Sequence, residues 1–182
     1  MRTFLLGGAR SGKSSLAARL AAERSNDVCC VVTALISDDE MRARIDTHRR
    51  ERPPHWRTRE EPVKLGMALQ EESTPGRVVL IDCLTLWTAN CLWPPAAVPA
   101  DPNRAFEPDI RGWHAERDAF LASLAATPHE VIIVSNEVGT SLVPENAAAR
   151  LFRDEQGRLN QLVAAACDSA FLVAAGLPLR LK

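Results

Sequence analysis

Short apolar runs alternate along this chain with longer segments in which apolar residues recur at helical spacing. The runs expected to form buried strands are 3–6, 28–32, 78–81, 131–134 and 171–174. The segments expected to form helices are 13–24, 38–50, 62–72, 108–126 and 146–167. This alternation predicts an α/β fold in which helices flank a mainly parallel sheet. After Gly176, residues 177–181 predict a short antiparallel edge strand near the C-terminus.

The first apolar run leads directly into a phosphate-binding motif. The pattern G-x-x-x-x-G-K-[ST] is completed by Gly7, Gly8, Ala9, Arg10, Ser11, Gly12, Lys13 and Ser14. In such a loop the backbone N–H groups face one centre, Lys13 brings a positive charge to the outer phosphates, and the Ser14 hydroxyl can ligate magnesium. The helix that follows adds the positive end of its dipole. Motif and alternation together predict a P-loop NTPase with a RecA-like sheet; a glycine-rich turn without a ligand is the alternative.

Length and composition limit the organisation of the chain. With 182 residues, of which 46% are hydrophobic, it can bury one continuous core, so we expect a single nucleotide-binding domain over residues 1–182. Residues 93–108 are proline-rich and lack periodicity, which predicts an exposed loop within that domain or a mobile flap over a large substrate. The net charge of -1 gives no global electrostatic reason to bind nucleic acid or an acidic membrane.

The cysteines and the N-terminal residues indicate the cellular compartment of the protein. Five cysteines are scattered without metal-ligand spacing, and most lie in apolar runs, which is typical of reduced core residues. The N-terminus lacks the long apolar region of a signal peptide, and no apolar stretch is long enough to span a membrane. We therefore expect a soluble, cytoplasmic protein.

A basic segment surrounds His48. Seven arginines lie between positions 42 and 59 against two acids, a local excess of five positive charges. Residues 37–40 have the S-x-x-E form of a capping box, so a helix should begin there and carry Met41, Ile45 and His48 along one stripe. His48 is then either a packed residue stabilised by the helix C-terminus, or an imidazole that becomes phosphorylated or nucleotidylated beside its arginines. The spacing leaves both interpretations open.

Two later segments place polar groups at strand ends. Asp82 ends an apolar strand, and in phosphate-loop proteins an acid at this place lies beside the loop and positions magnesium, directly or through water. Thr85 follows it and is expected to cap a helix rather than to contact a phosphate. Residues 135–139, SNEVG, follow another strand and should lie at the same sheet edge as the phosphate loop, where open α/β sheets bind ligands.

These motifs combine into a resemblance that covers nearly the whole chain. The chain resembles the bifunctional adenosylcobinamide kinase / adenosylcobinamide-phosphate guanylyltransferase family of cobalamin biosynthesis. The resemblance rests on GGARSGKS at 7–14, DDEMRARIDTHRRERPPHWRTRE at 38–60, the strand with its acid and LT at 78–85, SNEVG at 135–139 and VPENAAARLFRDEQGRLNQ at 143–161. The order and spacing of the set exclude most other phosphate-loop families.

The resemblance implies two reactions on one scaffold. The enzyme phosphorylates adenosylcobinamide with ATP or GTP, then transfers GMP from GTP onto adenosylcobinamide phosphate through a guanylylated histidine, which corresponds to His48. Lys13 is its partner in catalysis, and Ser14 and Asp82 hold Mg²⁺. Beyond the phosphate loop, the positions that match guanine-nucleotide contacts are Val32, Thr33, Ala34, Arg49, Arg50, Glu51, Arg52, Glu60 and Asp82. A homotrimer is also implied, with no nucleic-acid partner and no membrane span.

Two other functions remain as alternatives at this point. One is a small-molecule kinase without the guanylyltransferase step, and the other is a RecA-like nucleotide switch or nucleic-acid motor. The near-neutral charge and the short chain disfavour the second. If His48 is the guanylylated residue, its helix must approach the phosphate loop, so we expect movement when nucleotide binds.

Overall fold

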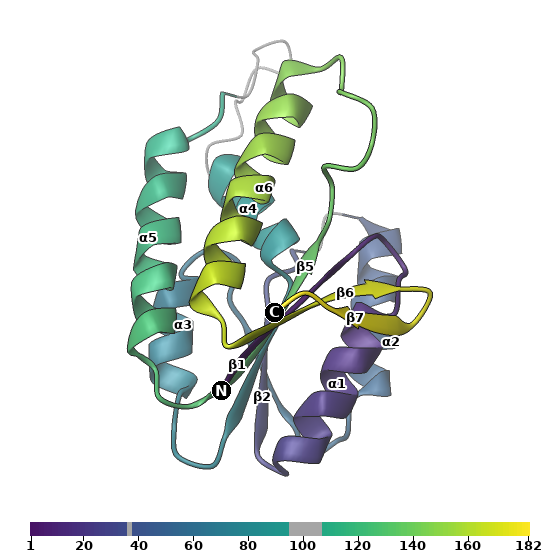
Figure 1. The fold of residues 1–182 in the computed structure, drawn as a ribbon, viewed down its shortest axis with the longest axis vertical. Helices are drawn as coiled ribbons and strands as arrows, with labels where there is room; N and C mark the ends of the chain where they lie inside the picture. The colour runs from purple at the N-terminus through teal and green to yellow at the C-terminus, as the bar shows by residue number, and fades with distance from the viewer. Residues whose placement is uncertain (36–37, 95–106) are drawn as a thin grey trace.

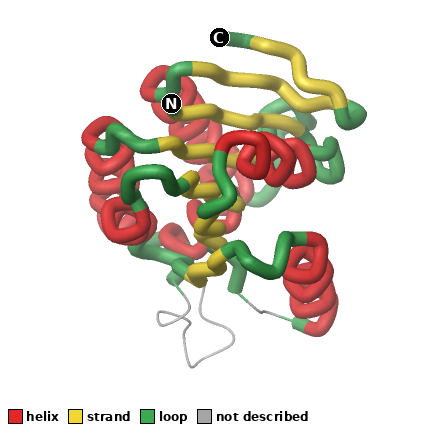
Figure 2. The backbone as a smooth tube through the Cα atoms, turned by 90° about the horizontal axis from the view of Figure 1, so that it is seen from below, coloured by secondary structure: helices red, strands yellow, loops and turns green. Residues whose placement is uncertain are grey.

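A computed structural model shows one seven-stranded sheet with helices on both faces (Figures 1 and 2). It describes residues 1–35, 38–94 and 107–182, without the side chains of Arg44, His48 and Glu51. The strands lie in the order β3-β2-β4-β5-β1-β6-β7. Their bounds are β1 Arg2–Gly7, β2 Val28–Val32, β3 Arg57–Glu60, β4 Val78–Asp82, β5 Glu130–Asn136, β6 Ser169–Ala174 and β7 Leu177–Arg180.

Six helices connect these strands within the described part of the chain. Their bounds are α1 Lys13–Arg24, α2 Asp39–Glu51, α3 Leu65–Glu72, α4 Leu84–Leu92, α5 Ile110–Ala126 and α6 Ala147–Ala166. None of the helices in the described ranges is both long and apolar enough to cross a membrane.

The sheet is parallel from β3 to β6, and only β7 runs antiparallel, against β6. Parallel strands need crossover connections, which the helices supply, and their carboxyl ends therefore meet at one edge. The predicted fold class is confirmed, including the antiparallel pair near the C-terminus.

Successive strand residues point to opposite faces, so the sheet is buried on both sides by two apolar clusters. On one face, α1 packs with Trp56 against alternate strand residues such as Leu5 and Leu80. On the other face, α3, α4, α5 and α6 cover residues such as Phe4 and Ile81. The near-continuous apolar runs seen in the sequence follow from this double burial.

Two elements were missed by the apolar pattern. Strand β3 has the sequence RTRE, whose polar side chains are mostly exposed because it is an edge strand; it is held by backbone pairing with β2. Helix α4 is largely buried. Its apolar residues therefore do not form a stripe along one face, so the sequence does not show the helical period.

The expected helix starts also differ in detail. Helix α2 begins after Asp38, whose carboxylate accepts a hydrogen bond from the Met41 N–H at 2.7 Å; Ser37, expected within the capping box, lies outside the described residues. Thr85 does not cap α4, where the N-cap residue is Cys83. Most of the proline-rich segment 93–108, together with the predicted flap, also lies outside the described residues.

Candidate nucleotide-binding site

The phosphate loop connects β1 to α1 at the carboxyl edge of the sheet. Two glycines of this loop are required by the structure as well as by the motif. A Cβ atom on Gly7 would lie 2.3 Å from the Val173 carbonyl oxygen, and Gly12 has a φ of +94°, in the left-handed region that favours glycine. Gly7 therefore lets β6 approach the loop closely, and Gly12 lets the loop turn into α1.

Lys13 is folded back across this loop. Its Nζ donates hydrogen bonds to the Gly8 carbonyl at 2.6 Å and to Ser11 Oγ at 3.4 Å. The side chain is only 6% exposed, and burial lowers the pKa of its ammonium group. Within the described residues no carboxylate lies within 4.0 Å of Nζ, so this desolvated cation is suited to an anionic ligand.

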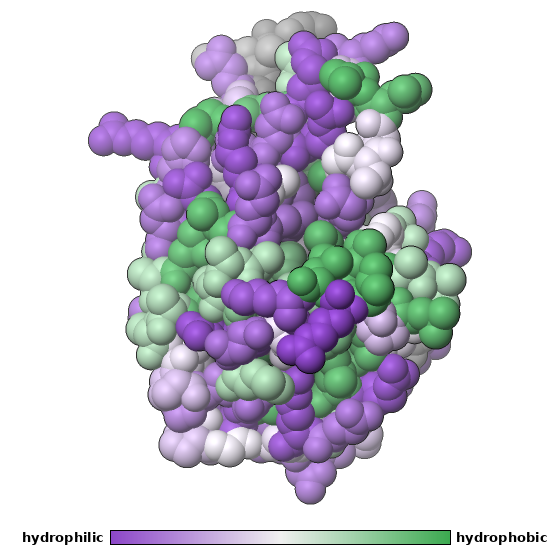
Figure 3. Space-filling view, viewed as in Figure 1, coloured by the Kyte–Doolittle hydropathy of each residue, from purple (hydrophilic) through white to green (hydrophobic). Residues whose placement is uncertain are grey.

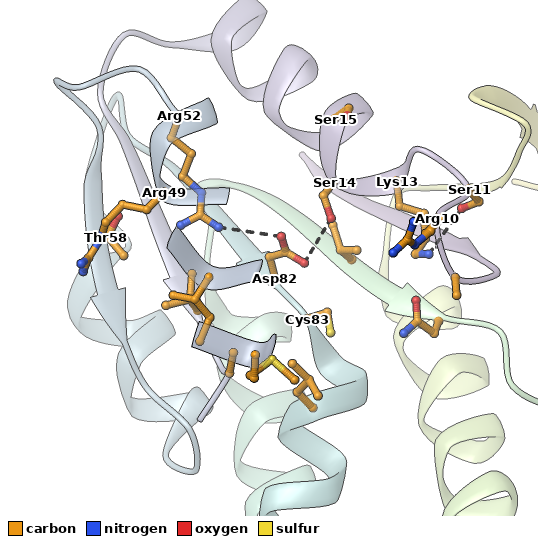
Figure 4. A pocket seen from close by; sticks show the side chains of 18 of the residues that line it. Arg10, Ser11, Lys13, Ser14, Ser15, Arg49, Arg52, Thr58, Asp82 and Cys83 are labelled. Carbon is orange, nitrogen blue, oxygen red and sulfur yellow. Dashed lines mark hydrogen bonds and ion pairs between the residues drawn. The ribbon is translucent and has the colours of Figure 1, made fainter. Parts of the chain in front are cut away.

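Asp82 lies beside the start of α1, at the end of β4. Its Oδ1 accepts a long hydrogen bond of 3.5 Å from Ser14 Oγ, and its Oδ2 lies 3.8 Å from the Arg52 guanidinium (Figure 4). Hydroxyl and carboxylate oxygens are the ligands that Mg²⁺ prefers, and Mg²⁺ in nucleotide sites uses one or two carboxylates together with phosphates. No group of three or more His, Cys, Asp or Glu that could hold a metal ion is found among the described residues; the Ser14 hydroxyl and the Asp82 carboxylate fit the sparser mode, in which phosphates complete the coordination.

A cavity of about 730 Å³ opens over these groups. It extends from the phosphate loop, across the ends of β4 and β2, to α2 and β3. Its lining beyond the loop residues 9–15 consists of Val32, Ala34, Leu35, Met41, Ile45, Arg49, Arg52, Thr58, Glu60, Asp82, Cys83, Leu86, Val134 and Asn136. Figure 4 shows the loop side chains on one side of this cavity, Arg49 and Thr58 on the other, and Asp82 between them. The cavity combines cationic and apolar walls, as a site for an anionic molecule with an aromatic base requires.

The structure brings most of the predicted site residues into this one cavity. Besides the loop residues from Ala9 to Ser14, these are Val32, Ala34, Arg49, Arg52, Glu60 and Asp82. Arg49 pairs with Glu60 at 3.3 Å, and both side chains are well exposed. Helix α2 and its C-cap residue thus contribute Arg49 and Arg52 to the same site as the phosphate loop.

A few predicted residues do not line the cavity. Gly7 and Gly8 lie just outside it, and the exposed Arg50 bonds to the Asp46 carbonyl of its own helix at 3.2 Å. Thr33 is fully buried: its hydroxyl donates to the Cys83 carbonyl at 2.7 Å and accepts from the Cys83 N–H at 3.1 Å. Thr33 therefore holds the segment after Asp82. The side chains of His48 and Glu51 lie outside the described part.

Several lining residues were not predicted as site residues. Met41 and Ile45 are on the stripe that the sequence assigned to helix packing. Cys83 follows the predicted acid, and burial raises the pKa of its thiol to about 11, so it is protonated near neutral pH. Asn136 ends β5 within the SNEVG segment; its place at the sheet edge was expected, whereas its place in the cavity was not.

A phosphate loop, a desolvated lysine and a strand-end carboxylate at the carboxyl edge of a parallel sheet define a P-loop nucleotide-binding protein. Solved structures agree with this fold. An ATPase from the type III secretion system of pathogenic bacteria is similar with a TM-score of 0.55, at 9% identity, over 94% of this chain and 50% of that chain. The assembled ATPase EscN from enteropathogenic Escherichia coli has a TM-score of 0.53, at 10% identity, over 96% of this chain and 43% of that chain.

The chain belongs to the cobinamide kinase / cobinamide phosphate guanyltransferase family, whose model matches residues 3–181. The bifunctional adenosylcobalamin biosynthesis protein CobP of Pseudomonas aeruginosa is 45% identical to it, over 100% of this chain and 98% of the relative. CobU of Escherichia coli, with the same description, is 38% identical over 100% of both chains. The protein is therefore a bifunctional kinase and guanylyltransferase, which agrees with the resemblance seen in the sequence.

Proposed function

We propose that the protein phosphorylates adenosylcobinamide with ATP or GTP and then transfers GMP from GTP to the product, giving adenosylcobinamide-GDP. The observation that carries this proposal is the single cavity shared by the phosphate loop and α2. A kinase alone needs the loop and its acid, whereas guanylyl transfer needs a second nucleophile that reaches the α-phosphorus of the same nucleotide.

The first reaction uses the loop side of the cavity. The loop N–H groups and Lys13 bind the outer phosphates, and Lys13 exchanges its contact with the Gly8 carbonyl for contacts with phosphate oxygens. Ser14 and Asp82 are the proposed residues that hold Mg²⁺, which supplies charge neutralisation and orientation of the phosphates when bound. Arg52, now 3.8 Å from Asp82, is close enough to stabilise negative charge that develops on the transferred group.

The second reaction uses α2. His48 lies three residues after Ile45 and four before Arg52, and both of these line the cavity. Helical spacing puts positions 45 and 48 on one face of α2, and Arg52 is the C-cap residue directly after the helix. In the proposed chemistry an imidazole nitrogen forms a bond to the α-phosphorus of GTP while the bond to pyrophosphate breaks; a phosphate oxygen of the acceptor then displaces the histidine. Movement of α2 toward the loop on nucleotide binding remains a prediction.

The roles of the other residues predicted to contact the nucleotide are proposed from where they lie relative to the cavity. We assign Val32, Ala34, Arg49 and Glu60 to direct binding of the guanine nucleotide, because they line the cavity on the side of β2, α2 and β3. Thr33 acts indirectly, by holding Cys83 and thus the strand end that carries Asp82. Arg50 and Glu51 are proposed as contacts formed only when nucleotide is bound.

We also propose the homotrimer, a cytoplasmic location and one nucleotide-binding domain. All described strands join one sheet, which supports the single domain. The five cysteines are free thiols, as a reducing compartment favours. On the outermost strand β7 and just after it, Leu177, Leu179 and Leu181 are 72%, 61% and 58% exposed. Figure 3 shows hydrophobic surface on the side where β7 lies, and an apolar sheet edge is a natural contact between subunits.

Incubation of the purified protein with adenosylcobinamide, magnesium and GTP labelled at the α-phosphate tests the proposal. Mass analysis should find corrinoid carrying phosphate and corrinoid carrying GDP, and denatured protein should carry one GMP. His48→Ala should lose the protein label and the second product but keep the first. His55→Ala, an exposed histidine in the same basic segment, is the matched control and should behave as the wild type. A His48→Ala protein that keeps its label would refute the covalent assignment.

A further inference from the structure

Asn136 occupies a central position at the carboxyl edge of the sheet. It ends β5, the strand between β4, which carries Asp82, and β1, which leads into the phosphate loop. In the sheet register Asn136 is paired with Gly7, the first residue of the loop. It also lines the cavity, on the side of Lys13 and away from Thr58 and Glu60 on β3. A group at this position lies close to the outer phosphates that Lys13 is expected to bind.

The backbone of Asn136 is held by side chains from two helices. Its N–H donates to Thr85 Oγ1 of α4 at 2.8 Å, and its carbonyl accepts from Asn160 Nδ2 of α6 at 3.1 Å. Asn160 is fixed in turn, because its Oδ1 accepts from Ser135 Oγ at 2.7 Å and from Gln156 Nε2 at 2.9 Å. All four supporting side chains are buried. This network orients Asn136 by contacts that do not use its own side chain.

The carboxamide of Asn136 is left available. Within the part of the chain that the structure describes, it makes no hydrogen bond, although it is half-buried and borders the cavity. A carboxamide offers two N–H donors without a charge, so it can bind a phosphate oxygen and still tolerate the nearby carboxylate of Asp82. A donor whose backbone is already held costs little reorganisation when charge develops on a transferred group.

We infer that Asn136 is a further catalytic residue, whose side-chain amide donates a hydrogen bond to an oxygen of the terminal phosphoryl group of the bound triphosphate during its transfer. This inference rests on the proposed kinase reaction. The bond from the terminal phosphorus to the bridging oxygen breaks while the acceptor hydroxyl oxygen forms its bond, and Asn136 stabilises the non-bridging oxygens without exchanging a proton. Thr85 and Asn160 are positioning residues that act through Asn136.

The inference predicts that Asn136 discriminates triphosphate from diphosphate. Removal of a hydrogen bond to a charged group weakens binding by about tenfold. In Asn136→Ala, the affinity for a non-hydrolysable GTP analogue should fall by that factor while the affinity for GDP stays unchanged. Asn136→Asp should show a larger loss, since it replaces a donor by a negative charge. Asn26→Asp makes the same chemical change at an exposed turn at the opposite edge of the sheet and should leave both affinities unchanged.

Calorimetric titration of each variant with both nucleotides, and single-turnover phosphorylation of adenosylcobinamide, measure these effects. A fall of about fivefold or more in the triphosphate-to-diphosphate preference supports the role of Asn136, and any smaller change overturns it. Because the carboxamide makes no bond within the described residues, Asn136→Ala should fold even if Asn136→Asp does not, as circular dichroism can verify. If the wild type fails to phosphorylate adenosylcobinamide, the proposed function is wrong, while the nucleotide preference still tests Asn136 independently.

Discussion

The hydroxyl of Thr33 is expected to stabilise the segment that carries Asp82, and Thr33→Val tests this with almost no change in shape. Thr33 is the first residue after β2 and is fully buried. Its hydroxyl makes two hydrogen bonds with the backbone of Cys83. The Cys83 carbonyl keeps a second contact, from the Trp87 N–H at 3.4 Å. Among the described residues the Cys83 N–H has no other hydrogen-bond partner, so valine leaves this donor unpaired.

The magnitude follows from these two bonds. Loss of a typical hydrogen bond costs about 1 kcal/mol, and an unpaired donor in a partly buried place costs about as much again, so Thr33→Val should lower the free energy of unfolding by about 2 kcal/mol. Thr88→Val is the matched control. Thr88 is equally buried, but its hydroxyl bonds only to the Leu84 carbonyl one turn earlier in α4, a local contact that contributes little. Thr88→Val should therefore lower the free energy of unfolding by less than about 1 kcal/mol.

Urea unfolding followed by circular dichroism gives both values, because a pure stability change moves the midpoint and leaves the slope unchanged. Thr33→Val should also weaken magnesium-dependent nucleotide binding, since the strand end with Asp82 becomes less constrained. Equal midpoints for Thr33→Val and Thr88→Val would refute the reasoning, because they would show that the bonds to Cys83 contribute no more than a local helix contact.

Three further predictions concern other parts of the molecule. Lys13→Met removes a desolvated ammonium group, so the ligand-free protein should keep or gain thermal stability while losing the stabilisation by GTP that the wild type shows in a thermal-shift assay. Asp168 accepts hydrogen bonds from the side chain and backbone of Arg2, which lower its pKa to about 2. Its contribution is present above the unfolded-state pKa near 4 and is lost as pH falls toward 2, so the stability difference between wild type and Asp168→Asn should shrink over that range. Leu179→Lys places a charge on the exposed edge strand and should dissociate the proposed trimer, as light scattering coupled to size exclusion can measure.

Each of these three predictions has an outcome that would contradict it. A Lys13→Met protein that GTP still stabilises would remove Lys13 from phosphate binding. A stability difference for Asp168→Asn that stays constant from pH 5 to pH 2 would show that the bonds to Arg2 do not depend on ionisation. A Leu179→Lys protein with the mass of the wild-type assembly would exclude β7 as the subunit contact.

Much of the candidate site was accessible from the sequence because its parts are local. The phosphate loop is a contiguous motif, and Asp82 follows a recognisable apolar strand, so both were placed correctly. Thr85 shows where local reasoning fails. Its position suggested a helix cap, whereas its hydroxyl accepts from the backbone of Asn136, 51 residues away in the chain. No local pattern contains such a contact.

The sequence by itself determined the alternation of strands and helices, the phosphate loop and the family, since each depends on periodicity or on adjacent residues. Only the tertiary structure decided that the polar segment RTRE forms strand β3. This strand is held by backbone hydrogen bonds to β2, and no apolar side chains mark it in the sequence. Only the tertiary structure placed Arg52 beside Asp82 and left Asn136 facing the cavity. The physical reason is that parallel strands bring their carboxyl ends to one edge through long crossovers, so residues far apart in the chain become neighbours there.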